Sequence, residues 1–414
     1  MLNLLITILL FSFFLSDVVS VGPNLYPLRI VAPIILIYGT ILLFHKIIVK
    51  NVTFKIDKAT WLTLCFFIFM AFSTFGVSGY RNVFLSQTYE LNDLLNYLFV
   101  FVLVFGLIVI GIQDKKSFLK KVNGVILVVY FLYLLMAIYE IQTGFHFHNS
   151  TLYDASDWMK YSPTVVYFNS NDFAAIFTMM FMYLLLNRKK ETEKSFLRSI
   201  FLLVIIILHT YILYESESRL SLLVFAIFLI YSYTRQFLLF CLFSLVAFAF
   251  IFCFVENSWF IQGLDEFTKF QQDFSFEERN STLVRLYLYK HALLSVFDSY
   301  GLGFGVFASE KYYQSIADPN LYYITNPHSY IFEILINSGF LSFIFYILLN
   351  TYMMAKSLIY RNKSIFLQLI LYNLLLFSSS SSLFLWPIYL FFILYVFEFD
   401  TMIEDRRTLT NKLI

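Results

Sequence analysis

The sequence predicts an all-α integral membrane protein with about twelve membrane-spanning helices and one large hydrophilic loop outside the membrane. Of its 414 residues, 60% are hydrophobic and only 14% are charged, whereas soluble domains average about half apolar and about a quarter charged residues. Glycine and proline are scarce, with 13 and 7 residues, which argues against a disordered or collagen-like chain. Apolar runs long enough to cross a bilayer recur along the chain and place most of it in lipid.

The apolar runs set the expected order of the spans. Nine precede the long hydrophilic segment and three follow it. The expected spans cover residues 2–16, 29–45, 59–78, 91–112, 122–142, 172–187, 197–214, 219–233, 236–255, 330–355, 364–379 and 383–398. The first run has no basic residue before it and no small-residue cleavage site after it, which favours a retained span over a signal peptide.

The distribution of basic residues predicts the orientation of these spans. Twenty of the 29 Lys and Arg residues fall in the carboxy-terminal segment and in the connections on the side of the amino terminus. By the positive-inside rule that side is the cytoplasm, and both termini lie in it. The predicted organisation is helices 1–9 in residues 1–255, an outer loop at 256–329, helices 10–12 in residues 330–398 and a cytoplasmic tail at 399–414.

The outer side carries the features that predict a site. Residues 280–297 follow a Ser or Thr cap with apolar side chains at helical spacing, so we expect an amphipathic helix inside the outer loop. The hairpins 197–233 and 364–397 are short for two spans each, because about sixteen residues rise only about 25 Å against about 30 Å of hydrocarbon. We therefore expect an outward-facing vestibule or a locally thinned outer leaflet at their apices.

The charge balance and the cysteines exclude several function classes. The formal net charge is +2 without long runs of one sign, so a nucleic-acid partner is not supported. The three cysteines, Cys65, Cys241 and Cys253, lie in apolar runs without the spacing of a disulfide framework or a metal site. The outer loops also lack an Asp-x-Asp pair, and we expect neither a metal ion nor another cofactor.

The apex of the hairpin 197–233 carries the first candidate site residues. Glu217 and Arg219 stand at the turn, directly before an apolar helix. One interpretation is that they pair with each other at the membrane interface. The other is that Arg219 faces a phosphate beside a substrate-binding Glu217, because a guanidinium stays charged and forks onto two oxygens.

Two further candidates lie within and directly after the outer loop. Arg285 belongs to the expected loop helix, where it either snorkels toward water or adds a second positive charge to the site. His328 follows Pro327, which marks a helix start, and imidazole is a competent base or donor near neutral pH. Tyr330 and Glu333 follow on that helix as substrate-binding candidates.

Polar residues and glycines in two other places allow a structural and a functional interpretation. Asn169, Asn171 and Asp172 either cap the sixth span or line the vestibule and bind sugar hydroxyls. The run Gly-Leu-Gly-Phe-Gly at residues 301–305 lacks a preceding strand and nucleotide-binding spacing, so it predicts a tight turn or a close backbone approach. His209, inside the seventh span, is expected to be structural.

Three motifs in combination resemble the O-antigen polymerase and O-antigen ligase superfamily of bacterial envelope enzymes. They are Ser-Glu-Ser-Arg219 at a hairpin apex, Arg285 in a large outer loop, and Pro-His328-Ser-Tyr before a Glu-Ile-Leu-Ile-Asn-Ser-Gly helix. Their order and topology match as well, and the resemblance covers about residues 169–345. The chain differs from the usual family pattern at Leu220, where the family has Gly, and at Ser329, where it has Asn.

The resemblance implies a glycosyltransferase of the C-type membrane fold that acts without a metal at the outer face of the bacterial cytoplasmic membrane. Its implied substrates are undecaprenyl-diphosphate-linked oligosaccharides embedded in membrane lipid, and its expected protein partners are a chain-length regulator and a flippase. Carried onto this chain, Arg219 and Arg285 neutralise the departing diphosphate, and His328 orients or deprotonates the attacking hydroxyl. The residues open as alternative bases are Asp172, Glu217, Glu278 and Glu333.

Three functions are compatible with these features. A polymerase joins lipid-linked repeat units into O-antigen or capsular polysaccharide, whereas a ligase moves the finished glycan to another acceptor with the same donor chemistry. A flippase or another transporter is the alternative from a different class. Transporters tend to have paired halves and polar sites at the midplane, but here the polar residues collect on the outer side. The long outer loop argues against transport, and the Phe- and Tyr-rich spans favour a polymerase.

Overall fold

The computed structural model describes residues 2–15, 27–48, 56–78, 91–155, 158–188, 196–233, 281–305, 308–316, 327, 329–377 and 386–413. Every regular element in these ranges is a helix. The predicted all-α class is therefore confirmed. Eleven of the twelve expected spans coincide with a helix, and the remaining one, at 236–255, lies outside the described residues.

The helices before the outer loop account for most of the bundle. They are α1 (Leu2–Leu15), α2 (Pro27–Ile48), α3 (Lys58–Ser78), α5 (Leu91–Gln113), α6 (Lys115–Thr143), the 3-10 helix η1 (Trp158–Tyr161), α7 (Ser170–Arg188), α8 (Phe196–Glu215) and α9 (Arg219–Tyr233). The later helices are α12 (Ser281–Asp298), α13 (Ala308–Ile316), α14 (Tyr330–Ile359), α15 (Lys363–Leu376) and α16 (Trp386–Leu413).

Five helices in this part of the chain are long and apolar enough to cross a membrane. They are α2, α3, α6, α14 and α16, and the other apolar helices are shorter. Length and composition thus identify a polytopic membrane protein. The predicted amphipathic helix at 280–297 is also present, as α12.

Several boundaries differ from the expected spans. Helix α6 begins at Lys115 rather than at 122, because the Asp114 side chain accepts a hydrogen bond from the Ser117 amide and caps the helix there. Helix α16 continues to Leu413, so residues 399–413 of the expected tail are helical. The short helices η1 and α13 were not anticipated from the hydropathy of the chain.

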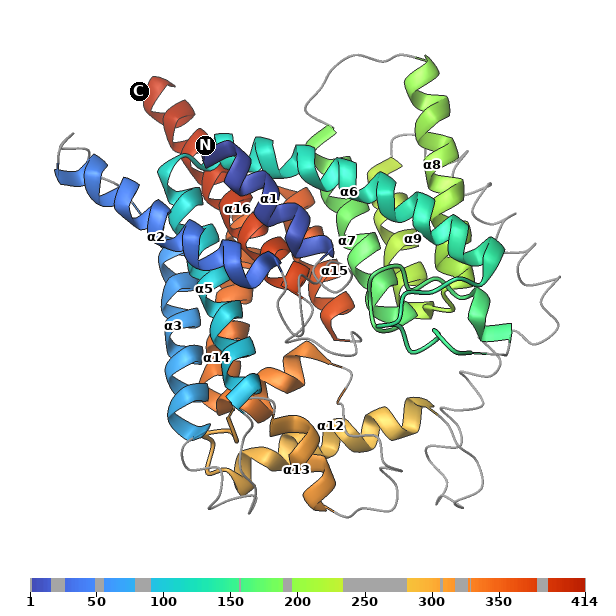
Figure 1. The fold of residues 1–414 in the computed structure, drawn as a ribbon. Helices are drawn as coiled ribbons and strands as arrows, with labels where there is room; N and C mark the ends of the chain where they lie inside the picture. The colour runs from blue at the N-terminus through green and yellow to red at the C-terminus, as the bar shows by residue number, and fades with distance from the viewer. Residues whose placement is uncertain are drawn as a thin grey trace.

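The two ends of the bundle differ in what they carry. Figure 1 shows both chain termini at one end and the helices α12 and α13 lying across the opposite end. We call these the terminal end and the loop end. Helices α7 and α9 pack against each other, and both begin at the loop end, as does the first part of α14.

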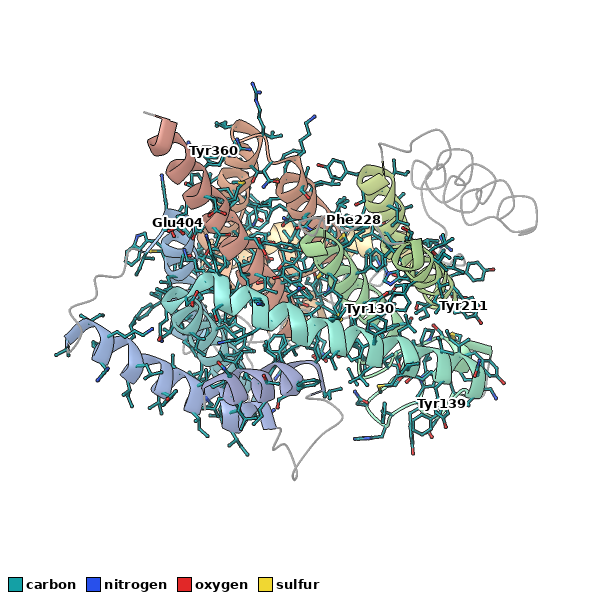
Figure 2. All side chains as sticks on the ribbon, turned by 90° about the horizontal axis from the view of Figure 1, so that it is seen from above. Tyr130, Tyr139, Tyr211, Phe228, Tyr360 and Glu404 are labelled. Carbon is teal, nitrogen blue, oxygen red and sulfur yellow. The ribbon has the colours of Figure 1, made fainter. Side chains whose placement is uncertain are left out.

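Aromatic residues fill the interior of the bundle. Figure 2 shows Tyr130 inside and Tyr139 and Tyr211 at the rim. His209 is fully buried, lies 4.3 Å from Phe177 between ring centroids, and has its Nδ1 atom 3.0 Å from the Tyr130 hydroxyl. Stacking and one hydrogen bond hold this histidine inside the bundle, which fits the expected structural role.

A buried ionic cluster fastens the terminal end. The Lys115 ammonium lies 2.5 Å from Asp57 and 3.1 Å from Asp400, which is almost fully buried. The amide of Thr60 donates to the same Asp400 oxygen at 3.1 Å. Because buried charges require such partners, this cluster joins the starts of α3 and α6 to the middle of α16.

Candidate functional site

Helix α14 is broken at Gly339. The φ and ψ angles of Gly339 are 82° and 177°, a conformation outside the helical region that glycine adopts without strain. The rings of Tyr330 and Tyr346 lie only 6.0 Å apart, although sixteen residues of straight helix would separate their backbones by about 24 Å. The expected span at 330–355 is therefore helical but contains a break at Gly339. The chain forms a first limb, residues 330–338, and a second limb, residues 340–359.

The second limb is long enough to cross the membrane without the first. Twenty residues rise about 30 Å, which equals the hydrocarbon thickness. Phe66 of α3 packs against both Phe345 and Tyr346 of this limb. The first limb is thus free to bend back at the loop end and to carry the motif that begins at Pro327.

The glycine-rich segment 301–305 satisfies the backbone groups that the break exposes. The amides of Phe304 and Gly305 donate to the carbonyls of Ile336 and Asn337 at 2.8 and 3.0 Å, and the Phe340 amide donates to the Gly301 carbonyl at 2.9 Å. We call residues 301–305 and 336–340 the glycine joint. Because the joint supplies these hydrogen bonds, the helix can break inside the protein without leaving its backbone groups unsatisfied.

The joint leaves no room for a side chain at its centre. A Cβ atom on Gly303 would lie 2.6 Å from the Gly339 nitrogen and 2.8 Å from the Asn337 oxygen, and Gly303 has a φ of +80°. Both neighbouring atoms belong to the backbone and cannot turn away. The predicted close backbone approach at residues 301–305 is confirmed, and the run is not a free phosphate-binding loop.

Asn337 connects the joint to the next helix of the loop. Its Oδ1 atom accepts hydrogen bonds from the amides of Ala308 and Ser309 at 3.0 and 3.2 Å and so caps the start of α13. Ser73 of α3 donates to the carbonyl of Ser338 at 2.5 Å. The sequence motif Glu-Ile-Leu-Ile-Asn-Ser-Gly already contained Asn337, but only the structure shows that this side chain caps a helix of the outer loop.

Helix α12 carries Arg285, which is half-buried. The Tyr313 hydroxyl of α13 donates to the carbonyl of Leu288 at 2.8 Å, and the Tyr312 hydroxyl donates to Asp298 at 2.7 Å. Burial raises the pKa of both phenols above their usual range, so both remain donors. Arg285 therefore sits on a helix that α13 ties to Asn337 and through it to α14.

Arg219 is the first residue of α9 and is exposed at the loop end. The turn before it is tight: Glu217 is exposed with a φ of 53°, and the Ser218 hydroxyl donates to Ser221 at 2.9 Å. The first amides of a helix favour a negatively charged group. A guanidinium at that position adds a full positive charge, which makes this apex suited to an anion.

The residues before α7 act first as a helix cap. The Asn169 Oδ1 atom accepts a hydrogen bond from the Asp172 amide at 2.9 Å, and its Nδ2 atom donates to the buried Asp172 carboxylate at 2.8 Å. This geometry confirms the capping interpretation for Asn169. Asn171 is half-buried beside them. Because α7 and α9 both start at the loop end, this cap and Arg219 lie at the same end of the bundle.

A buried polar network, absent from the sequence predictions, holds the segment before this cap. One Glu140 oxygen accepts hydrogen bonds from the Thr164 and Val165 amides, both at 2.8 Å, and Val165 is held at a φ of 52°. The His146 ring contacts the Thr164 hydroxyl at 3.0 Å and the Lys160 carbonyl at 2.6 Å. We call Glu140, His146, Thr164 and Val165 the Glu140 network. A lone Glu in the last turn of an apolar helix was the signal for it.

The first limb of α14 places its candidates inside the bundle. Ser329, Tyr330 and Glu333 are all buried, and the Tyr330 ring lies 5.7 Å from that of Tyr389. A buried carboxylate among phenols has hydrogen-bonding partners but little water. His328 lies outside the described residues, between Pro327 and Ser329, which are both buried.

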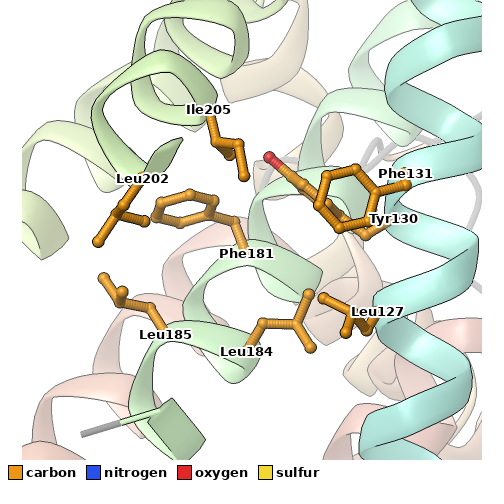
Figure 3. Close-up of a pocket in the computed structure, with 8 residues that line it drawn as sticks. All are labelled: Leu127, Tyr130, Phe131, Phe181, Leu184, Leu185, Leu202 and Ile205. Atoms are coloured by element: carbon orange, nitrogen blue, oxygen red, sulfur yellow. The ribbon is translucent and has the colours of Figure 1, made fainter. Parts of the chain in front are cut away.

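A small apolar cleft of about 30 Å³ lies between α6, α7 and α8. Figure 3 shows its eight lining side chains, which are almost entirely hydrocarbon. They are Leu127, Tyr130, Phe131, Phe181, Leu184, Leu185, Leu202 and Ile205. Such a lining offers no hydrogen bond to a sugar or a phosphate.

No group of three or more His, Cys, Asp and Glu side chains suited to a metal occurs within the described ranges. The polar candidates instead combine two arginines, a capped helix start and a buried carboxylate at one end of the bundle. That combination can bind an anion and a hydroxyl-rich group next to an apolar interior.

These features define a class: a polytopic α-helical membrane protein with its polar candidate site at one end and a helical loop packed over that end. Residues 201–347 match a family model described as O-Antigen ligase. The match contains Arg219, Arg285, His328 and the glycine joint, and it confirms the resemblance to the O-antigen polymerase and ligase superfamily.

A curated relative supports the same assignment. The chain is 27% identical over 244 residues to the teichuronic acid biosynthesis protein TuaE of Bacillus subtilis (strain 168). The match covers 55% of this chain and 49% of the relative, so the chain spans about half the length of that protein. No solved structure matches the chain significantly.

Proposed function

We propose that the protein is a membrane glycosyltransferase that polymerises undecaprenyl-diphosphate-linked oligosaccharide repeat units into an O-antigen or a capsular polysaccharide. The observation that carries this proposal is the family match over residues 201–347, which contains both candidate arginines and His328. The relative, named for teichuronic acid biosynthesis, supports a role in building an envelope polysaccharide. The loop end then faces the outside of the cytoplasmic membrane.

In the proposed reaction an acceptor hydroxyl attacks the anomeric carbon of the donor sugar. A carbon–oxygen bond forms while the bond from that carbon to the diphosphate breaks, and the electron pair leaves with the diphosphate. Arg219 and Arg285 stabilise the charge that develops on this leaving group, because fixed positive groups act most strongly in a partly dry site. Neither a metal ion nor a nucleotide takes part in these steps.

The proton of the attacking hydroxyl goes to a base as the new bond forms. His328 is the proposed base or orienting group. Its usual pKa of about 6.5 is far below that of a sugar hydroxyl, so proton transfer accompanies bond formation. Buried Glu333, five residues further along the first limb, and Asp172 beside the α7 cap are alternative acceptors.

Two other parts of the molecule fit this proposal. The cap residues Asn169 and Asn171 and the exposed Glu217 lie at the same end of the bundle as Arg219 and offer hydrogen bonds to sugar hydroxyls. Tyr330 and Glu333, which are buried in the first limb, are the other proposed substrate-binding residues.

Ligation is the second candidate, because the matching family model is described as O-Antigen ligase. A ligase uses the same donor and the same arginines but transfers the finished glycan to a different acceptor. The chemistry at Arg219 and Arg285 is common to both functions. The identity of the acceptor therefore distinguishes them.

The test is a gel of glycan chain length from cells that lack the protein and are complemented with wild type or Arg219→Lys at matched membrane levels. A single-repeat band that becomes a ladder only with wild type supports polymerisation. Arg219→Lys is expected to lose most of the ladder, since an ammonium cannot fork onto two oxygens. A normal ladder from this variant removes Arg219 from the site.

Other outcomes of the same gel separate the alternatives. Long chains that never reach their final acceptor in the deletion strain identify a ligase. Repeat units that accumulate inside the cell and are never exported identify a flippase. A His328→Ala variant that inserts normally but makes no ladder supports His328, whereas full activity reduces it to a helix-start residue.

A further inference from the structure

Tyr289 occupies the place where α12 meets the bundle. Its ring stacks on Phe332 of the first limb, with centroids 4.6 Å apart, and contacts Phe377 at the end of α15 at 5.1 Å. Its hydroxyl donates a hydrogen bond to the Phe377 carbonyl at 3.2 Å. Phe332 and Phe377 also pack on each other at 5.7 Å. Tyr289 thus connects α12 to both α14 and the end of α15.

The end of α15 supplies the hydrogen-bond acceptor for Tyr289. Helix α15 has 14 residues and ends at Leu376, so it rises only about 21 Å and stops short of a full bilayer crossing. The Phe377 carbonyl at its end accepts the Tyr289 hydroxyl.

Tyr289 also lies next to Arg285. The two residues are four positions apart, which places them on the same face of α12. Burial raises the pKa of the Tyr289 phenol above its usual value, and the charge of Arg285 lowers it by a smaller amount. The phenol therefore stays protonated and donates its hydrogen bond while it is within electrostatic reach of the guanidinium.

We propose that Tyr289 is a positioning residue for the transfer reaction, which holds Arg285 at a fixed distance from the limb that begins with the His328 motif. The inference rests on the proposed function. Phe332, the stacking partner, is four residues after His328 and one before Glu333. Through Tyr289, the arginine helix and the limb with the proposed base move as one body.

A positioning role predicts a specific kinetic effect. Arg285 is proposed to stabilise charge that appears only in the transition state, so misplacing it lowers kcat more than it changes KM. Displacement of a catalytic group by about 1 Å lowers rates by up to about a hundredfold. A residue that only stabilises the fold changes the amount of active protein and not this ratio.

The experiment uses the full chain in proteoliposomes with lipid-linked repeat units as donor and acceptor. Tyr289→Ala is expected to lower kcat by about tenfold or more with KM within about threefold. Tyr289→Phe keeps both ring contacts and is expected to retain kcat within about threefold. Tyr153→Ala is the matched control, since Tyr153 is 54% exposed on the segment before α7, and it should match wild type.

A double-mutant cycle with Arg285→Lys decides how Tyr289 acts. If Tyr289 acts through the guanidinium, Tyr289→Ala causes little further loss in the Arg285→Lys background. The inference is overturned if the double variant loses kcat by the product of the two single losses. It is also overturned if Tyr289→Ala alone has the kcat of wild type. If Tyr289→Ala lowers the unfolding temperature, Tyr289→Leu replaces it in the experiment, because leucine keeps the apolar volume but has no flat ring. The expected changes in kcat and KM are the same. A wild-type protein without any transfer activity refutes the proposed function instead.

Discussion

Two segments at the loop end are attached to the bundle by different physical means. The segment with α12 and α13 is joined to the broken α14 by backbone hydrogen bonds across the glycine joint. The segment between α6 and α7 is held by side chains of the Glu140 network. Backbone atoms in the glycine joint cannot move aside for a new side chain. In the Glu140 network a substitution removes only the hydrogen bonds of one side chain, and some of these side chains are titratable. We therefore expect any added side chain in the glycine joint to destabilise the protein strongly. Substitutions in the Glu140 network should destabilise it by smaller amounts, and its stability should depend on pH.

The largest effect is expected from Gly303→Ala. The new methyl group would lie 2.6 Å from a backbone nitrogen, at a residue with a φ of +80°. Steric conflict together with backbone strain is expected to destabilise the protein by about 3 kcal/mol or more and to abolish activity. Thermal unfolding of the purified protein in detergent measures this.

Gly124→Ala is the control for that variant. No atom lies within 4 Å of the Cβ position at Gly124, which is inside α6. Alanine in a helix is more favourable than glycine by about 0.5–1 kcal/mol, so this variant should be as stable as wild type or slightly more so. Equal stability of the two variants would contradict the account of the glycine joint.

A smaller effect is expected from Glu140→Ala. It leaves the buried amides of Thr164 and Val165 without their acceptor, at a cost of about 1–3 kcal/mol for each unsatisfied group. Glu140→Gln keeps a carbonyl oxygen that can accept both bonds and should be much milder. Hydrogen exchange of the amides at 164 and 165 is the measurement, and equal exchange in the two variants would refute the role of Glu140.

The smallest effect is the dependence of stability on pH that His146 of the Glu140 network contributes. Burial lowers the pKa of His146 below its usual value, and the bond to the Lys160 carbonyl only partly offsets this. A histidine with a lowered folded-state pKa stabilises the fold fully above about pH 6.5 and loses that contribution as the pH falls through the lowered value.

Unfolding temperatures between about pH 7.5 and 5 are expected to fall more for wild type than for His146→Gln. The Glu140 carboxyl group faces the ring, 3.7 Å from its Nδ1 atom. Because this group already accepts two amides, it only partly offsets the effect of burial on the ring. The same pH slope in both proteins would show that His146 does not titrate in this range.

The structure also separates the candidate residues by how accessible they are. Arg219 and Glu217 are exposed at the turn before α9, and Arg285 is half-buried on α12. Glu333 and Tyr330 are buried in the first limb. The exposed residues suit contact with a charged headgroup, whereas the buried ones suit support of the limb that carries the His328 motif.

The sequence by itself determined the helices and the residue types of the site. Whether a stretch of about twenty residues crosses a membrane depends on its own composition, so α2, α3 and α5 match their expected spans closely. The same is true of local caps, such as Asn169 before α7 and the apex that ends at Arg219. These features involve residues within a few positions of one another.

Only the tertiary structure decided where the chain breaks and what holds the pieces together. Hydropathy shows an unbroken apolar run through Gly339, and the break is stable because residues 301–305 supply its hydrogen bonds from more than thirty positions away. Asn337, Glu140 and Tyr289 act likewise on partners that are distant in sequence. A hydrogen bond or a ring contact has its energy only at close range, and proximity between remote residues is a property of the folded chain.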